Sequence, residues 1–497
     1  MTNRNRGFKP PPLPGQTTNR ALKLLGCVGL LVILVPLLGL GIWFVSKRRA
    51  TNTTIQKLEN AARQRGEPLT LADLKAKYAQ LPDDQNAALA LIALWRPEDP
   101  ELWDAFLNGE RPLPRPVQKT FDPALPYLGA DTMRVPRGLL TTNALRAAEQ
   151  FLAERGEHLA VVAAALTNNR ARFPVDFDAG PLLQLPHLAR LKLEAHSFSI
   201  AALMAGERGA VPLALTHLKN ITRVGQTVAD EPLLISQMVR LACYNSVFEG
   251  AEQLLSRQTG SVETLEQLKE LFNELELRGA ARTVLVNERA LALALFDPDF
   301  MALAVTQNNE ADEAVHEMET NPEQVRNGLA VINKVGLLKA DRKLLLETIE
   351  TAVALAEAGT PEALKRTRAL FDELEVKSRK FPPKIISGMT LPPLGIVADQ
   401  FATLEARRRA ALVALAVEQY RLQHNGQLPE HLKELTPDFL PALPLDPFDG
   451  AELRYRKLER GFVVYSVGKD LGDDGGRETS QRGKMIRSWD VTFVIER

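Results

Sequence analysis

An uncharged apolar run near the N-terminus constrains this chain more than any other feature. It extends from Leu24 to Val45 and contains 22 residues without a charged side chain. As an α-helix the run rises roughly 33 Å, which is enough to cross the hydrocarbon core of a bilayer. Trp43 suits the interface with water, and Lys47 begins the basic stretch that ends the run. We therefore predict a single transmembrane helix over 24–45, with membrane lipid as its partner.

A cleaved signal peptide is the alternative interpretation of this run. The run is longer than a typical signal-peptide core and has no small-x-small cleavage site before Lys47, so an anchor is favoured. Cys27 imitates a lipobox cysteine, but a working lipobox follows its apolar run, whereas Cys27 precedes most of this one. Residues 1–23 are basic, proline-rich and without acidic side chains, which predicts a disordered tail.

Composition excludes several classes of function. The 61 basic and 61 acidic residues cancel, so no net charge attracts nucleic acid, and we expect no nucleic-acid partner. The two cysteines, Cys27 and Cys243, are too few for a cysteine-based metal site. At 497 residues and 45% apolar content, the chain is long enough to bury a core outside the membrane.

The apolar residues after the membrane run recur at helical spacing. The pattern extends over 51–380 and is clearest from Leu185 to Leu277, where it predicts a helix hairpin with a turn at 206–209. No repeat of fixed length is present, so we predict an irregular α-helical bundle or short solenoid. Pro382-Pro383 and Pro392-Pro393 then predict a proline-rich linker over 381–398.

The pattern changes after this linker. A helix is predicted over 399–424, followed by strands at 453–456, 462–465 and 491–495. The fold class is therefore mainly α, with a transmembrane helix, a helical body and a small α+β domain over 399–497 whose sheet is antiparallel.

Two motifs connect this last domain to a known family. The first motif, Asp446-Pro447-Phe448, precedes the first predicted strand. The second, Ser466-x-Gly468-x-Asp470, begins directly after the second predicted strand. In these motifs the region resembles the globular domain of major pseudopilins of the type II secretion system, while 51–380 matches no family that we can name. The resemblance implies an exported body, and hence a bacterial inner-membrane protein with a periplasmic body.

The resemblance also implies a calcium site. Asp470 and Asp490 stand where the family has side-chain ligands, and Asp473 and Asp474 would add carboxylates. Calcium takes about six to eight oxygen ligands, so backbone carbonyls would have to contribute. A solvated Asp-Gly-rich turn without an ion is the alternative. The chain departs from the family in Leu471, where relatives have glycine, and in lacking a pilin processing site before Leu24. We therefore do not expect it to polymerise as a pilin.

Other motifs point to no particular chemistry. The seven histidines lack metal-ligand spacing, and no Gly-x-Ser-x-Gly, phosphate loop or dinucleotide fingerprint is present. Glu288-Arg289 places a charged pair in an apolar helical stretch, where one member lines a groove or both are paired within the bundle.

These observations favour a membrane-anchored protein-binding or structural module with an unknown protein partner over an enzyme. An envelope hydrolase with a site near Glu288 and an accessory subunit of a secretion apparatus remain as alternatives.

Overall fold

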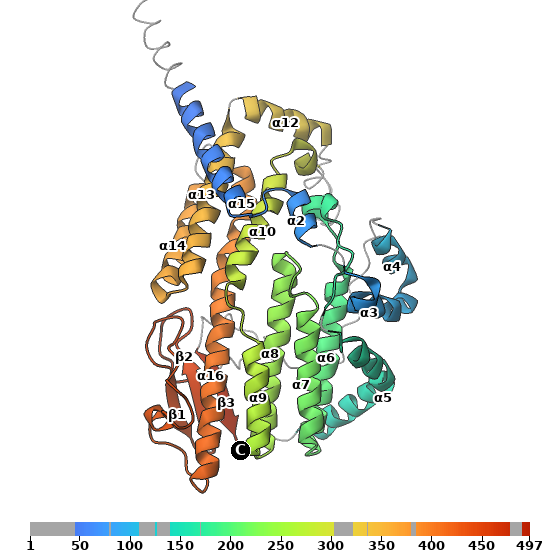
Figure 1. Cartoon of the computed structure of the whole chain (residues 1–497), viewed down its shortest axis with the longest axis vertical. Helices are drawn as coiled ribbons and strands as arrows, with labels where there is room; N and C mark the ends of the chain where they lie inside the picture. Colours follow the sequence, from blue (N-terminus) through green and yellow to red (C-terminus); the bar gives the residue numbers. More distant parts are fainter. Residues whose placement is uncertain are drawn as a thin grey trace, which may run out of the picture. The chain divides into compact units, whose positions relative to one another are not determined.

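The computed structural model divides the chain into two compact units, Met1–Leu58 and Glu59–Arg497 (Figure 1). It describes residues 45–78, 81–108, 125–126, 140–168, 170–302, 322–334, 336–378, 384–477 and 490–497. The predicted tail over 1–23 lies outside these ranges, as does the predicted membrane helix over 24–45 apart from Val45. Residues 45–64 are helical. None of the helices in the described ranges has the length and apolar character needed to cross a membrane.

The unit Glu59–Arg497 is mainly helical, which confirms the predicted helical class. Its α-helices are α2 (Leu71–Lys77), α3 (Ala87–Trp95), α4 (Pro100–Leu107), α5 (Thr142–Ala165), α6 (Pro186–Glu207), α7 (Val211–Gln226), α8 (Leu234–Arg257), α9 (Val262–Glu274), α10 (Ala280–Ala294), α12 (Pro322–Lys334), α13 (Leu337–Ala358), α14 (Pro361–Ser378), α15 (Ile385–Thr390) and α16 (Val397–Gln423). Helices α6, α7 and α8 pack on one another, and α6 and α7 form the predicted hairpin. Gly209 makes the turn between them, with φ of 70°.

Side chains that satisfy orphan backbone N–H groups mark where several helices begin. Thr70 and Asp73 form a capping box at the start of α2: the Asp73 N–H donates to Thr70 Oγ1 at 3.1 Å, and the Thr70 N–H donates to Asp73 Oδ2 at 2.9 Å. Ser261 accepts from the Thr264 N–H at 3.1 Å at the start of α9. Local polar chemistry therefore fixes these boundaries.

The stretch over 381–398, which was expected to be a proline-rich linker, is largely helical from Lys384 onward. From Lys384 onward, the described part of 381–398 consists of α15, the 3₁₀ helix η5 (Pro392–Ile396) and the first residues of α16. Asp341 of α13 is buried and accepts hydrogen bonds from the Ile386 N–H at 2.9 Å and the Ser387 N–H at 3.2 Å. Pro392-Pro393 opens η5, where a helix needs no N–H donor, so these prolines begin a helical turn within the packed body.

The predicted C-terminal sheet is present and antiparallel, with strand order β1-β2-β3. The strands are β1 (Arg454–Leu458), β2 (Gly461–Ser466) and β3 (Val491–Glu496). Figure 1 shows the long α16 running across the sheet, with α9 beside it, and α16 contacts β2, β3, α8 and α9. A side chain at Gly461 would meet the Ile495 carbonyl oxygen at 2.0 Å, so the β1–β2 turn requires glycine.

Helix α8 also protects the outer edge of β3. The Val494 N–H donates to Glu252 Oε1 at 2.8 Å, and the Glu496 N–H donates to Ser256 Oγ at 3.1 Å. Unpaired edge N–H groups would otherwise be free to pair with another chain. The sheet is therefore joined to the helical body by hydrogen bonds as well as by its apolar face.

Candidate functional site

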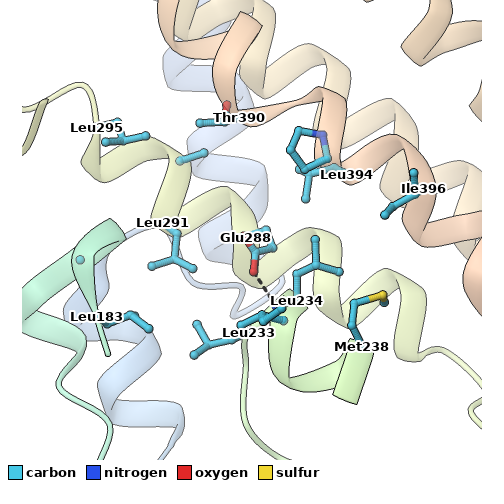
Figure 2. Close-up of a pocket in the computed structure, with 14 residues that line it drawn as sticks. Leu183, Leu233, Leu234, Met238, Glu288, Leu291, Leu295, Thr390, Leu394 and Ile396 are labelled. Atoms are coloured by element: carbon cyan, nitrogen blue, oxygen red, sulfur yellow. Dashed lines mark hydrogen bonds between the residues drawn. The ribbon is translucent and has the colours of Figure 1, made fainter. Parts of the chain in front are cut away.

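An apolar cavity of about 460 Å³ opens among four parts of the helical body. The parts are the 3₁₀ helix η3 (Phe177–Leu182) with the residue after it, the start of α8, helix α10, and the α15–η5 region. The lining residues are Gly180, Leu183, Leu233, Leu234, Ile235, Met238, Glu288, Leu291, Ala292, Leu295, Thr390, Pro393, Leu394 and Ile396. Figure 2 shows leucine side chains from several of these elements around one carboxyl group, that of Glu288.

Glu288 comes from α10 and caps the start of α8. Its Oε1 accepts a hydrogen bond from the Leu234 N–H at 2.6 Å (Figure 2). Leu234 is the first residue of α8, where backbone N–H groups have no partner within the helix. Burial raises the pKa of the Glu288 carboxyl to about 7, although the hydrogen bond from Leu234 acts in the opposite direction. The group therefore changes charge close to neutral pH.

The structure separates the two members of the Glu288-Arg289 pair. Arg289 is 1% exposed in its side chain and donates from Nη2 to Glu67 Oε2 at 2.8 Å. Arg65 and Arg282 also donate to the Glu67 carboxylate. Arg289 is thus paired within the bundle, as the structural interpretation expected, while Glu288 lines the cavity.

The cavity offers few polar groups that could take part in a reaction. Among its described lining residues, the polar side chains are those of Glu288 and Thr390. The Thr390 hydroxyl donates to the Ile386 carbonyl at 2.8 Å, so it is engaged within its own helix. At the rim, Ile235 and Ile396 are 54% and 51% exposed, which continues the apolar surface outward. The arrangement suits binding of apolar groups more than acid–base chemistry, which needs a second convergent polar group.

Two buried carboxylates elsewhere in the body were not found from the sequence. Glu231 accepts from Ser236 Oγ and lies 3.0 Å from His187 Nε2. Glu194 lies 2.8 Å from His158 Nε2 and accepts from Trp95 Nε1 at 3.1 Å. Each histidine is tens of residues from its carboxylate in the chain, so no spacing rule could have joined them. Buried charges of this kind need such partners, and a structural role accounts for both.

The family motifs of the C-terminal domain meet at a single carboxylate. Asp446 is buried and accepts at Oδ1 from the Ser466 hydroxyl (2.8 Å) and the Phe448 N–H (2.9 Å). At Oδ2 it accepts from the Val467 N–H (3.0 Å) and Arg454 Nη1 (2.9 Å). The two motifs are therefore one hydrogen-bonded unit that attaches the loop before the sheet to the end of β2.

The four aspartates proposed as calcium ligands lie in or beside the loop after β2. Burial raises the pKa of Asp490, and the neighbouring Asp473 and Asp474 carboxylates raise it further, against hydrogen bonds from backbone N–H groups. Those N–H groups are Gly476, at 2.7 Å, and Asp474, at 3.4 Å. Asp470 instead accepts from the Gly472 N–H of its own turn at 3.2 Å. Within the described ranges, no three His, Cys, Asp or Glu side chains are grouped so as to hold a metal ion; residues 478–489 are outside them.

Comparisons with protein-family models, with curated proteins and with solved structures found no match for this chain. The resemblance of 399–497 to major pseudopilins therefore rests on the motifs around Asp446 and Ser466 and stays a prediction. The cavities and hydrogen-bond networks of the body are the basis for the function proposed next.

Proposed function

We propose that this chain is a single-pass, membrane-anchored bacterial protein whose helical body binds an apolar segment of a partner protein in the Glu288 cavity. The observation that carries the proposal is the cavity of about 460 Å³, with apolar walls, an apolar rim and one carboxyl group. The run over 24–45 supports attachment to the inner membrane, and the pseudopilin resemblance supports a periplasmic body.

A hydrolase is the second candidate, and the pKa of Glu288 is the observation that favours it. A carboxyl group with a pKa of about 7 is suited to proton transfer at neutral pH. Hydrolysis also needs a nucleophile or a second group that activates water. Because the other polar side chain of the described lining, Thr390, is engaged with the Ile386 carbonyl, binding has the stronger support.

The rim favours a polypeptide over a free small molecule as the occupant. A small molecule inside the cavity would leave the exposed side chains of Ile235 and Ile396 in water. A partner helix or extended segment could place one large apolar side chain in the cavity and cover both isoleucines with its neighbours. Since burying one such side chain contributes only about 1.5 to 3 kcal/mol, contact with the rim is needed for a stable complex.

Glu288 makes the proposed binding depend on pH. Below its pKa of about 7 the carboxyl is neutral, and the cavity presents no charge to an apolar occupant. Above this pH the same occupant would remove a carboxylate from water, which opposes binding. We expect affinity for an apolar segment to fall as the pH rises above about 7.

The C-terminal domain supports two further proposals. Its resemblance to pseudopilins favours a role beside a secretion apparatus, as an accessory subunit. The same resemblance, which makes Asp470 and Asp490 side-chain ligands, supports calcium binding in the loop after β2, with ligands completed by backbone carbonyls.

Site-specific photo-crosslinking in the native cells tests the binding proposal. A photoreactive phenylalanine analogue replaces Ile235 of the full-length chain, and the same analogue at exposed Val262 of α9, outside the cavity lining, is the matched control. We expect a polypeptide adduct at Ile235 that is absent at Val262. The adduct should disappear when Leu291→Trp fills the cavity, with unfolding midpoints confirming that the variant is folded.

The possible outcomes separate the candidates. An adduct that persists in Leu291→Trp would place the partner elsewhere and contradict the proposal. Binding of the uncharged dye Nile red, lost in Leu291→Trp but without any polypeptide adduct, would indicate a small apolar ligand instead. Deletion of residues 1–45 should move the chain from the membrane fraction to the supernatant; retention in the membrane would contradict the anchoring proposal.

A further inference from the structure

A second cavity, of about 450 Å³, is lined in part by the segment that precedes α8. Asp230 and Glu231 of this segment border the second cavity, whereas Leu233 and Leu234, where the segment joins α8, border the first. Helix α10 also contributes to both cavities: Asn287 lines the second and its neighbour Glu288 lines the first. Polar groups predominate in the second lining, so the two cavities accept different chemistry.

Cationic side chains outnumber carboxylates around the second cavity. Its described lining includes four cations, Lys77, Arg172, Arg240 and Arg278, and two carboxylates, Asp230 and Glu231. Both carboxylates already have partners. Asp230 accepts from Arg172 Nη2 at 2.8 Å. Glu231 accepts from Ser236 and lies beside His187 beneath the cavity. Arg278 is also paired, with 3.0 Å between its Nη2 and Glu276 Oε1. Among the cations of the described lining, Arg240 and Lys77 are therefore the two available to an occupant.

Arg240 is held in place for such a contact. Its Nε donates to the Tyr244 hydroxyl at 3.0 Å, its Nη1 donates to Gln237 Oε1 at 3.4 Å, and its guanidinium lies 5.3 Å from the centre of the Tyr244 ring. These contacts use two of its three nitrogens and fix the plane of the group, which lowers the entropy lost when a ligand binds. Lys77 lies exposed at the end of α2, without an ion pair to the described residues, and adds a mobile charge.

Asn287 adds a neutral polar group to the lining. The residue is 5% exposed and borders the cavity, so its side-chain amide can donate to an occupant. An amide N–H beside a fixed guanidinium is a suitable donor pair for an anion's oxygens.

We propose that this cavity binds a small anionic ligand through phosphate or carboxylate oxygens, with Arg240 and Asn287 as its fixed donors and Lys77 as a neutralising charge. This site is separate from the Glu288 cavity and does not depend on the function proposed for it. The two sources of such oxygens, a phosphate compound and a carboxylic acid, are distinguished by the probes of the test.

Isothermal titration of the full-length chain in a mild detergent tests the proposal, with inorganic pyrophosphate in one arm and succinate in the other at matched ionic strength. We expect saturable binding of at least one probe. Its dissociation constant should weaken about tenfold in Arg240→Gln, which removes a charge-assisted hydrogen bond, and should weaken in Lys77→Gln. Lys365→Gln removes the same charge from the exposed face of α14, outside the cavity lining, and should leave affinity unchanged.

If Arg240→Gln fails to fold, the Lys77→Gln variant still tests the proposal, because Lys77 is exposed and its replacement is expected to leave the fold intact. Equal weakening in Lys365→Gln would show only general attraction of anions to basic residues and would overturn the proposal. Absence of heat with both probes up to millimolar concentrations would overturn it as well.

Discussion

Arg289 and Glu67 are joined by a buried ion pair, with 2.8 Å between Nη2 and Oε2, although they stand 222 residues apart in the chain. The side chains are 1% and 4% exposed. The pair ties α10 to the segment just before α2, and it turns Arg289 away from the cavity that its neighbour Glu288 lines. One buried pair therefore decides which of two adjacent charges is available to a ligand.

Replacement of Glu67 by Gln should destabilise the body strongly. Among the described residues, the Glu350 carboxylate, 3.6 Å away, would then be the one remaining ionic partner of the buried Arg289 charge. Breaking a buried pair by removing one member costs about 3 to 5 kcal/mol, which urea unfolding of the full-length chain in detergent would measure. Glu357→Gln, which removes a more exposed partner of Arg282, is the control and should cost less than about 1 kcal/mol. A similar loss in both variants would contradict the prediction.

Acidification should weaken the same pair. Burial alone would raise the pKa of Glu67, but hydrogen bonds from Arg65 and Arg289 outweigh it and lower the pKa to about 2, from an ordinary value of 4.5. The stabilisation is therefore complete above about pH 4.5 and is lost as the pH falls toward 2. Thermal unfolding midpoints of the wild type and Glu67→Gln should converge over this range. Parallel pH profiles would show that the carboxylate contributes no stability of this kind.

Glu288→Gln should have the opposite pH dependence. Because the folded-state pKa is raised from 4.5 to about 7, the wild type is most stable below about pH 4.5 and loses stability as the pH rises through 7. The shift corresponds to about 3 kcal/mol between the two limits. Gln carries no charge, so the variant should lack this loss, and urea unfolding at pH 5 and pH 8 would show it gaining on the wild type. If the difference between the two proteins is the same at both pH values, the carboxyl does not titrate in this range.

Local sequence signals predicted local structure well. The Thr70 capping box involves residues three apart, and β2 and β3 are short runs of mainly β-branched and aromatic residues that are buried along most of their length, so both can be read from short stretches. Proline was less informative at Pro392-Pro393, because the same residue that ends a helix is also suited to its first positions. The segment is helical because Asp341 accepts from the Ile386 N–H and because η5 packs against α16. No short stretch of sequence contains that information.

The cavity and the buried carboxylates are formed by residues far apart in the chain, so they were harder to predict than the helices and strands. Glu288 stood out as a charge in an apolar helix, which is a local signal. Its apolar surroundings come from four separate parts of the chain, so the cavity itself could not be foreseen. The same holds for Glu231 with His187 and for Glu194 with Trp95, whose members lie 44 and 99 residues apart.

Asp446→Asn should destabilise the C-terminal domain. The carboxylate accepts two hydrogen bonds at each oxygen, whereas an amide offers one oxygen and leaves a buried donor facing the Val467 N–H and Arg454. An unsatisfied buried group costs about 1 to 3 kcal/mol, which urea unfolding would measure. Asp449→Asn weakens the more exposed contact with Arg454 but keeps an oxygen that can accept from the Ala451 N–H, so it should cost less than about 1 kcal/mol. Equal stability of the two variants would contradict the role of Asp446 as the junction of the two motifs.

Glu252→Ala should expose the outer edge of β3. The Val494 N–H loses its acceptor, and its hydrogen exchange should accelerate by about tenfold or more if the lost bond contributes 1.4 kcal/mol. Glu249→Ala is a matched control, because both carboxylates are paired with Arg407 while Glu252 is the acceptor of the Val494 N–H. Acceleration of the same size in both variants would assign the effect to Arg407 and not to the strand edge.

Calcium should stabilise the chain if the loop after β2 holds the ion. At 100 times the dissociation constant the gain approaches about 2.7 kcal/mol, which is measurable as a shift of the unfolding midpoint between calcium and chelator. Asp490→Asn should abolish the shift, because the family resemblance makes Asp490 a side-chain ligand. Asp470→Asn discriminates further: the resemblance makes Asp470 a ligand as well, whereas the hydrogen bond that it accepts from the Gly472 N–H lies within its own turn. Loss of the shift in both variants supports the site that the resemblance implies, and loss in Asp490→Asn alone supports a site without Asp470. A midpoint that does not respond to calcium in the wild type would refute calcium binding and leave the loop as a turn held by its own backbone hydrogen bonds.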